Sequence, residues 1–371
     1  MIQTVFYRKY RPKTFKEVIN QKNIIQTLIS ALKQGKVSHA FLFSGPRGTG
    51  KTTVARLLAK ALNCKKLEIG NWKLEIPNYE PCNECESCLE INSGRALDLI
   101  EIDAASNRGI DDIRALKENI RFSPVKSKYK IFIVDEAHQL TKEAFNALLK
   151  TLEEPPPYII FILATTEPEK LPATILSRVE RYDFKKLTLS DIISRLKYIA
   201  EKEEIKSEEE AFRLIAVYSE GGLRDAESLL GQISILTEKN VTKEIMEGLM
   251  GFVNFEKTKR FIDILNKKDK VRAIEFINKI YDDGFELGFF VKEIINYLRK
   301  LLLLKISPGL GIILEKETTN NEMTILFKQS QAWETARLER LLRKLIEAEA
   351  RLKRTPVATL PLELFISEEL E

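Results

Sequence analysis

A glycine-rich stretch around residue 50 carries the clearest chemical signal in the sequence. It reads Gly45-Pro46-Arg47-Gly48-Thr49-Gly50-Lys51-Thr52-Thr53. Residues 45–52 match the phosphate-loop pattern G-x-x-x-x-G-K-S/T, in which glycines let backbone N–H groups turn toward phosphate oxygens. Lys51 can reach the β- and γ-phosphates of a nucleotide, and the Thr52 hydroxyl can ligate Mg²⁺. An incidental turn is the alternative, but an apolar strand before the loop and a helix after it favour a triphosphate site.

Two adjacent carboxylates, Asp135 and Glu136, follow an apolar run that begins at Lys130. In a phosphate-loop ATPase, Asp135 can hold Mg²⁺ and Glu136 can orient and polarise the attacking water. The alternative is a buried strand that ends in an acidic cap, with His138 incidental. The intact phosphate loop upstream favours the catalytic interpretation.

All four cysteines of the chain lie in one segment, as Cys64, Cys82, Cys85 and Cys88. The Cys-x-x-Cys spacing brings two sulfurs to one side of a tight turn, and four thiolates make a closed tetrahedral zinc site. Disulfides are disfavoured in a reducing cytoplasm, and unrelated free thiols rarely cluster so tightly. We therefore expect a Zn²⁺ site that stabilises the fold, with no open position for catalysis.

Three isolated side chains could act beside these groups. Thr165 follows an apolar run and could sense the γ-phosphate or the attacking water. Arg178 could reach a neighbour's nucleotide if the chain assembles into a ring of ATPases. Arg224 opens a helix after two glycines and could reach back to the phosphates. As alternatives, Arg178 is an ordinary exposed arginine, and Arg224 forms an exposed charge pair with Asp225 that contributes little stability.

An aromatic and basic segment, residues 6–20, precedes the phosphate loop. Pro12 disfavours a helical conformation in the residue before it, so we expect an irregular arm rather than a helix. The arm could supply an adenine pocket and cationic contacts, from Tyr10, Pro12, Val18 and Ile19 and from Arg8 and Arg11 respectively. It could equally pack on the domain surface, and the residues alone leave both interpretations open.

The elements that must position these side chains alternate between apolar strands and helices. We expect strands over 40–43, 97–102, 130–135 and 158–164, and helices over 24–32, 54–62, 110–120 and 142–152. This alternation predicts an α/β domain with a parallel sheet. From residue 187 to 239 the strands stop and three helices form a small lid, and from residue 241 onward every segment is helix-like.

Composition sets broader limits. A chain of 371 residues favours two or three domains, and a net charge of +5 permits local nucleic-acid-binding patches without requiring them. The first residues lack the apolar core of a signal peptide, and no apolar run is long enough to span a bilayer. We therefore expect a cytoplasmic protein with no membrane contact.

Four further runs are distinctive. They are Tyr7-Arg-Lys-Tyr-Arg-Pro12, Cys82-x-x-Cys-x-x-Cys88, Ile102-Asp-Ala-Ala-Ser106 and Phe145-Asn-Ala-Leu-Leu-Lys-Thr-Leu-Glu-Glu-Pro155. With these runs, the chain resembles the gamma/tau subunits of bacterial DNA polymerase III, the AAA+ ATPases of the sliding-clamp loader. The resemblance extends from Tyr7 to the C-terminus. It departs from the family at Val179, where cysteine is usual, and the sequence ends at Glu371 without the long tail of the tau form.

The resemblance implies a role for each candidate residue. Residues 45–52 would bind ATP, and the four cysteines would bind zinc. Asp135 would be the Mg²⁺ ligand, and Glu136 would activate the attacking water. Thr165 and Arg224 would be the first and second sensors, and Arg178 the finger that acts on the adjacent subunit. Arg108 and Lys150 would contact DNA phosphates inside the ring. Without the resemblance, Lys150 is an ordinary solvated surface lysine.

The resemblance also implies an architecture and partners. We expect an α/β P-loop AAA+ domain over 1–184, with a parallel sheet that carries helices on both faces and an inserted zinc module at 64–88. A helical lid over 185–240 and an all-α collar over 241–371 would follow. The implied partners are delta-type and delta-prime-type subunits and further copies in a pentameric ring, the sliding clamp, and primer–template DNA. A DNA translocase or helicase of the same ATPase class is the main alternative; the zinc module and the helical C-terminal domain argue against it. A non-enzymatic interaction subunit would tolerate a broken phosphate loop, and no separate carboxylate cluster supports a polymerase active site.

Overall fold

The computed structural model describes residues 5–67, 79–106, 118–249, 255–314, 318, 320–352 and 354–369. The chain divides into two compact units, residues 1–241 and 242–371. The expected helix over 110–120 lies mostly outside the described residues.

A parallel five-stranded sheet forms the centre of the first unit, in the order β2-β3-β4-β1-β5. The strands are β1 (Ala40–Ser44), β2 (Leu99–Asp103), β3 (Lys130–Asp135), β4 (Ile159–Thr165) and β5 (Glu180–Asp183). The apolar runs of β1, β3 and β4 are buried almost without interruption, as expected of parallel strands that are covered on both faces. The four predicted strands are confirmed. β5 was not predicted, because only Tyr182 of its four residues is buried and the strand has no apolar run.

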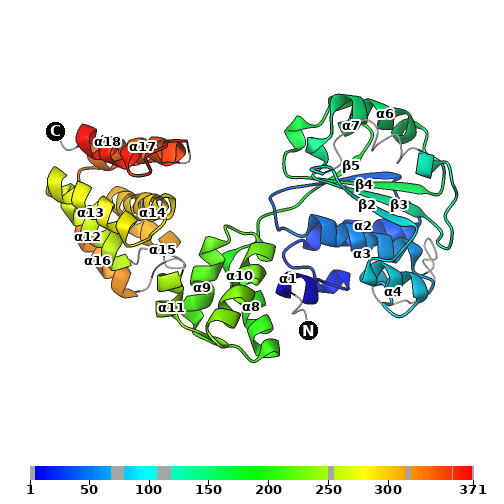
Figure 1. Ribbon diagram of the computed structural model, residues 1–371, viewed down its shortest axis with the longest axis horizontal. Helices are drawn as coiled ribbons and strands as arrows, with labels where there is room; N and C mark the ends of the chain where they lie inside the picture. Colours follow the sequence, from blue (N-terminus) through cyan, green and yellow to red (C-terminus); the bar gives the residue numbers. More distant parts are fainter. Residues whose placement is uncertain are drawn as a thin grey trace. The chain divides into compact units, whose positions relative to one another are not determined.

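Helices cover both faces of this sheet (Figure 1). On one face lie α2 (Lys22–Gln34) and α3 (Lys51–Asn63), and on the other α6 (Lys142–Glu153) and α7 (Ala173–Leu176). Successive strand residues point to opposite faces, so Phe41 and Phe43 pack under α2 and α3 while Leu42 packs under α6 and α7. The expected α/β architecture with helices on both faces is confirmed.

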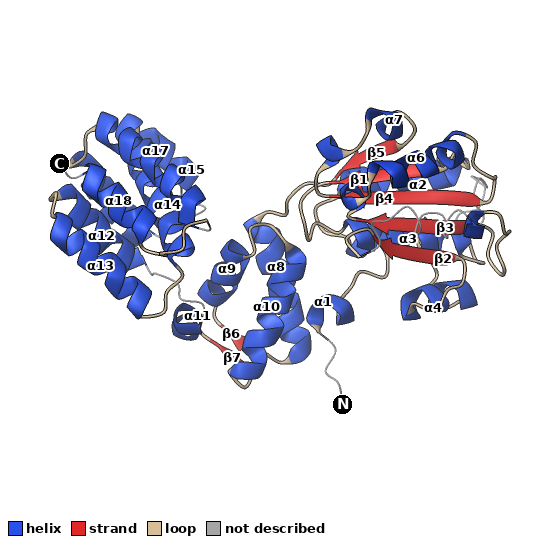
Figure 2. Ribbon diagram, turned by 45° about the horizontal axis from the view of Figure 1, so that its top comes forward, coloured by secondary structure: helices blue, strands red, loops and turns tan. Residues whose placement is uncertain are grey.

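The lid helices complete the first unit, as α8 (Leu189–Glu203), α9 (Glu209–Tyr218) and α10 (Leu223–Leu236). Thr188 begins α8 with a capping box, in which its side chain accepts from the Asp191 N–H and the Asp191 carboxylate accepts in return. The three predicted helices are confirmed. The expectation that strands stop here was wrong, because β6 (Lys206–Ser207) and β7 (Asn240–Val241) form a short parallel pair (Figure 2). Strands of two residues are too short to leave a pattern in the sequence.

The N-terminal arm is also more regular than expected. Residues Phe6–Lys9 form one helical turn, α1, and Phe15–Glu17 form a 3₁₀ turn. The prediction of an arm without helix was wrong because Pro12 restricts only Arg11, and the earlier residues remain free to turn. Phe6 is buried against α10, where its ring lies 3.3 Å from the position that a Cβ on Gly231 would occupy. The arm is therefore fastened to the lid.

Every regular element described in the second unit is a helix. Its helices are α11 (Lys243–Leu249), α12 (Phe255–Asn266), α13 (Lys270–Asp282), α14 (Leu287–Ile306), α15 (Gly311–Leu314), α16 (Asn320–Gln331), α17 (Thr335–Leu352) and α18 (Leu360–Glu369). α14 supplies much of the core, and α17 packs against it with Leu338, Leu341 and Leu345. The expected helical C-terminal domain is confirmed. Among the described helices, none combines the length and the hydropathy needed to cross a membrane.

Candidate functional site

The carboxyl edge of the sheet gathers the chemistry-bearing residues. Ser44 at the end of β1 pairs with Thr165 at the end of β4, and Asp135 ends β3 beside them. Parallel strands end at one edge, and ligands of open α/β sheets bind there. The phosphate loop begins at this edge, where the Gly45 N–H donates to the Thr165 carbonyl at 3.2 Å.

A pocket at this edge joins the loop to the arm and the lid. From the loop and the acidic strand it is lined by Arg47, Gly48, Thr49, Gly50, Lys51, Thr52, Thr53, Asp135 and Glu136. From the arm it is lined by Tyr7, Arg11, Pro12, Glu17, Val18 and Ile19, and from the lid by Leu187, Arg195, Leu223, Arg224 and Glu227. One pocket is thus lined by the phosphate loop, the arm and the lid together.

Lys51 lies inside the loop that it follows. Its Nζ donates to the carbonyls of Gly45 at 2.7 Å and Pro46 at 2.8 Å, and only 5% of the residue is exposed. Burial lowers the pKa of Lys51, against the opposing effect of the Glu136 and Asp135 carboxylates. The ammonium is therefore held against the loop backbone at the wall of the pocket.

The two expected Mg²⁺ ligands lie side by side. The Thr52 hydroxyl donates to Asp135 Oδ2 at 2.8 Å, although the two residues are far apart in the sequence. A hydroxyl and a carboxylate are hard oxygen donors of the kind that Mg²⁺ prefers, so this pair fits the ion. Glu136 follows with a left-handed backbone, at φ 48°, and its Oε2 accepts from the Thr166 hydroxyl at 3.2 Å.

His138 joins this group, although the sequence suggested no role for it. Its side chain is nearly buried, with Nδ1 2.9 Å from the Thr165 hydroxyl and 3.5 Å from Glu136 Oε2. Thr165 is fully buried and does not line the pocket itself. The histidine therefore links Thr165 to Glu136. The sequence could have indicated this role, because His138 follows Glu136 by two residues at the end of the same strand.

The lid touches the phosphate loop directly. The Leu223 N–H donates to the Gly48 carbonyl at 3.2 Å, and a Cβ on Gly48 would lie 2.9 Å from the Gly222 Cα. Arg224 lies in the pocket with its guanidinium 4.7 Å from the centre of the Tyr7 ring. Its hydrogen bond to the Tyr7 hydroxyl lowers the pKa of that tyrosine. Arg224, the lid residue that the sequence predicted to reach the phosphates, therefore lines the pocket in this structure.

Tyr10 is a correction to the expected adenine pocket. Arg11, Pro12, Val18 and Ile19 line the pocket as expected, but Tyr10 does not. Its hydroxyl donates to Glu203 at 2.5 Å and its ring packs edge-on against Tyr198, so both ends of the side chain are held by α8. Tyr7 occupies the pocket in its place. Arg8 does not line the pocket either.

A buried ion pair in the lid also lines the pocket and was missed. Arg195 Nε donates to Glu227 Oε1 at 2.9 Å, and both side chains are at most one-tenth exposed. Burial raises the pKa of Glu227, while the Arg195 charge opposes that effect. Arg195 also donates to the Tyr10 carbonyl, which ties the arm to the lid. Both helices carry other charged residues, so nothing in the sequence distinguishes Arg195 or Glu227.

Arg178 and Lys150 lie away from this pocket. The Arg178 guanidinium donates to Glu153 Oε1 at 2.5 Å and to the Thr174 carbonyl at 2.7 Å. It borders a separate hollow with Ser38 and His39. Lys150 is exposed on α6, and Arg108 lies outside the described residues.

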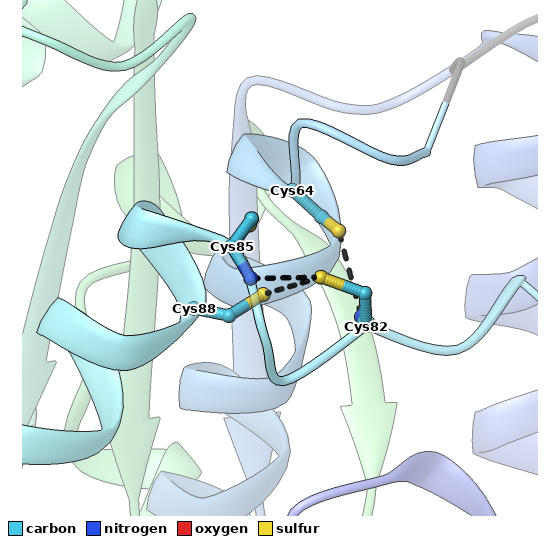
Figure 3. Close-up of side chains that lie close together, drawn as sticks. All are labelled: Cys64, Cys82, Cys85 and Cys88. Carbon is cyan, nitrogen blue, oxygen red and sulfur yellow. Dashed lines mark hydrogen bonds between the residues drawn. The ribbon is translucent and has the colours of Figure 1, made fainter.

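The four cysteines converge, as Figure 3 shows. All their sulfur atoms lie within 4.8 Å of one another. Cys82 Sγ is 3.9 Å from Cys88 Sγ and accepts from the N–H groups of Glu84 and Cys85. Sulfurs that are bound to one zinc at about 2.3 Å stand roughly 3.8 Å apart at tetrahedral corners. The four thiols are therefore compatible with a zinc ion in donor type, and the Cys82–Cys88 distance is close to the tetrahedral value.

Because the lid contacts the phosphate loop at Gly48, we expect alanine substitution to have different effects at Gly48 and Gly50. Gly48 and Gly50 have φ of +76° and +100°, so alanine at either strains the backbone. Only Gly48→Ala also meets the lid backbone; a Cβ on Gly50 has open space within 4 Å. We expect Gly48→Ala to release the Leu223 amide, with hydrogen exchange over 222–226 faster by about fivefold, the equivalent of one net hydrogen bond. Gly50→Ala is the matched control, and equal exchange in both variants would contradict the contact.

Three family models match successive parts of the chain. Residues 20–188 match a model described as DNA polymerase III, delta subunit. Residues 191–239 match the ATPase lid domain of the DNA polymerase III clamp loader subunit, and residues 241–366 match domain III of the DNA polymerase III subunits gamma and tau.

Whole-chain relatives carry the gamma and tau names. The chain is 42% identical to the DNA polymerase III subunit tau of Bacillus subtilis over 332 residues, which cover 90% of this chain and 57% of the relative. It is 39% identical to the Escherichia coli subunit tau over 309 residues, 83% of this chain and 47% of the relative. The chain thus spans about half the length of these tau subunits.

A shorter relative is matched over most of its own length. The DNA polymerase III subunit gamma of Buchnera aphidicola subsp. Schizaphis graminum is 39% identical over 319 residues, 86% of this chain and 85% of the relative. The delta-named model reaches only residue 188, whereas the gamma and tau relatives extend over both units. The resemblance drawn from the motifs is confirmed: the chain belongs to the gamma/tau subunit family of DNA polymerase III.

Proposed function

We propose that this chain is an ATPase subunit of a clamp loader, which binds and hydrolyses ATP to open a sliding clamp and place it on primed DNA. The observation that carries the proposal is the pocket that brings the phosphate loop, the Thr52–Asp135 pair, Glu136 and Arg224 together. We assign the ATPase domain to residues 1–184, the lid to 185–240 and the collar to 241–371.

In the proposed reaction, the loop N–H groups and Lys51 bind the phosphates of ATP. Thr52 and Asp135 would hold Mg²⁺, which neutralises phosphate charge when bound. Glu136 orients the attacking water, and its Oε2 accepts from the Thr166 hydroxyl at 3.2 Å. The same Oε2 lies 3.5 Å from His138 Nδ1, which also contacts the Thr165 hydroxyl. Arg224 brings a positive charge from the lid to the same pocket.

Arg178 acts on a different subunit in this proposal. It lies outside the pocket of its own chain, so it can serve catalysis only on the nucleotide of a neighbour. We propose a pentameric ring of further copies with delta-type and delta-prime-type subunits, in which Arg178 completes the adjacent site. Glu153 and the Thr174 carbonyl hold the guanidinium until a neighbour's phosphates compete for it.

The same ring would face DNA on its inside. Lys150, which is exposed on α6, and Arg108 are proposed to contact phosphates of the primer–template duplex. Phosphate contacts position a protein without reading sequence, which suits an activity that is needed at any primer end.

The cysteine cluster is proposed to bind Zn²⁺ and to stabilise its segment of the ATPase domain. Four thiolates leave no open coordination position, so the ion would be structural. Removing one ligand should release the ion because a structural site needs all four. We expect close to one zinc ion per chain in the unaltered protein and a small fraction of that in Cys88→Ser, measured by elemental analysis after dialysis. Ser87→Ala, at the residue before Cys88 on α4 (Glu86–Ser93), is the control and should retain its zinc. A wild-type protein purified in the presence of zinc that retains none would contradict the site.

Glu136→Gln separates binding from hydrolysis. The substitution keeps the size of the side chain but removes the carboxylate that orients water, and losing such a group costs about 10²–10⁴ in rate. We expect ATP turnover to fall by about that factor with the ATP dissociation constant nearly unchanged. Glu169→Gln, at an exposed carboxylate nearby, should turn over ATP normally. Turnover in Glu136→Gln within about threefold of wild type would remove Glu136 from the mechanism.

The clamp-loading role is tested by ATP turnover of this chain mixed with delta-type and delta-prime-type subunits. Turnover should rise with primed DNA and rise further with the clamp. In the same assay Arg178→Ala should keep ATP binding but lose most of the DNA stimulation, an effect of about 10³ or more in arginine-finger systems. Arg181→Ala, which removes a nearby exposed arginine, should behave as wild type. Equal stimulation by any DNA, indifferent to the clamp, would favour a translocase and contradict the proposal.

A further inference from the structure

A buried lysine remains outside the phosphate chemistry. Lys60 lies near the C-terminal end of α3 and is only 2% exposed. Its Nζ donates to the Lys13 carbonyl at 2.8 Å, to Asn83 Oδ1 at 2.7 Å and to Asn92 Oδ1 at 3.0 Å. An ammonium has three donors, and each has an acceptor here. A buried charge this well satisfied holds its partners in one geometry.

The three acceptors of Lys60 come from separate segments. Lys13 belongs to the N-terminal arm, Asn83 lies in the loop between Cys82 and Cys85, and Asn92 is on α4 (Glu86–Ser93). Asn83 Nδ2 also donates to the Lys13 carbonyl at 3.0 Å, and Asn92 Nδ2 lies 3.3 Å from Asn83 Oδ1. The Lys13 carbonyl therefore accepts from both Lys60 and Asn83. This shared acceptor joins the arm to residues 79–93, which carry Cys82, Cys85 and Cys88 and are called the cysteine segment below.

A second anchor lies next to the first. The Glu80 carboxylate accepts from the N–H groups of Phe15 at 2.5 Å and Lys16 at 3.0 Å. Phe15 is fully buried among residues of α2 and α3. Residues 13–16 of the arm are thus held at three backbone positions by the cysteine segment and α3.

The anchored residues lie between two parts of the pocket wall. Arg11 and Pro12 line the pocket before them, and Glu17, Val18 and Ile19 line it after them. Because the phosphate loop takes the other end of the pocket, this wall would meet the nucleoside. If residues 13–16 were released from these contacts, the pocket-lining residues on both sides of them, 11–12 and 17–19, would be free to move.

We propose that Lys60 and Glu80 are positioning residues for nucleotide binding, which fix the nucleoside wall of the pocket by holding residues 13–16 of the arm against the cysteine segment. This inference rests on the proposed ATP site. It gives the cysteine segment a second role beyond its own stability, since that segment supports the pocket from outside.

The proposal predicts a selective loss of affinity. If the arm is released, only the fraction of molecules with the wall in place binds the nucleoside, and the apparent affinity falls by that fraction. The phosphate loop is built on β1 and α3 and does not need the arm. Inorganic tripolyphosphate, which has no nucleoside, should therefore bind as before. A general loss of folding would weaken the binding of both ATP and tripolyphosphate.

The experiment measures calorimetric binding of ATP and of tripolyphosphate, each with Mg²⁺, to the whole chain. Lys60→Met removes the charge with a side chain of similar length, and Glu80→Ala removes the second anchor at a less buried position. In both variants we expect the ATP dissociation constant to rise about tenfold and that of tripolyphosphate to change less than about twofold. Glu80→Gln keeps one carbonyl acceptor and should recover part of the ATP affinity. Lys22→Met, at an exposed lysine on α2, is the control.

Melting temperature and zinc content, measured in parallel, show whether each variant is folded. If Lys60→Met does not fold, Glu80→Ala decides alone. Unchanged ATP affinity in folded Glu80→Ala, or an equal loss for both ligands, would overturn the inference while wild-type binding upholds the ATP site. Wild-type protein that fails to bind ATP would contradict the proposed function and this inference with it.

Discussion

The loop between β1 and α3 is held from two sides, and the rest of the first unit is arranged around that constraint. On the sheet side the Gly45 N–H donates to the Thr165 carbonyl, and on the lid side the Gly48 carbonyl accepts from Leu223. Both positions need glycine, because a Cβ on Gly45 would lie 2.4 Å from the Phe184 carbonyl oxygen and a Cβ on Gly48 would lie 2.9 Å from the Gly222 Cα. A loop fixed in this way can present N–H groups to phosphate without first becoming ordered, which lowers the entropic cost of binding.

The same constraint explains why the arm and lid line one pocket together with the phosphate loop. Phe6 packs on α10, Arg195 donates to the Tyr10 carbonyl, and Arg224 stacks on Tyr7, so the arm and lid share their contacts. The cysteine segment holds residues 13–16 of the same arm. A change at the phosphates would therefore reach the lid through Gly48 and the arm through the pocket wall.

Much of this arrangement could be predicted from the sequence because the signals are local. The phosphate loop, the strand before Asp135 and the cysteine spacing each specify their geometry within a few residues. β5 was missed because a four-residue edge strand with one buried side chain has no pattern. Tyr10 was placed wrongly and Tyr7 overlooked because the choice between them depends on packing against α8, far along the chain. His138, Arg195 and Glu227 acquire their partners only through the tertiary fold.

The central claim is that loop, arm and lid form one nucleotide site, and hydrogen exchange of the whole chain with and without ATP and Mg²⁺ tests it most directly. The account predicts that the ligand slows exchange together over residues 45–53, 11–19 and 222–226. Slower exchange in the phosphate loop alone, with the arm and lid exchanging as they do without ligand, would contradict it.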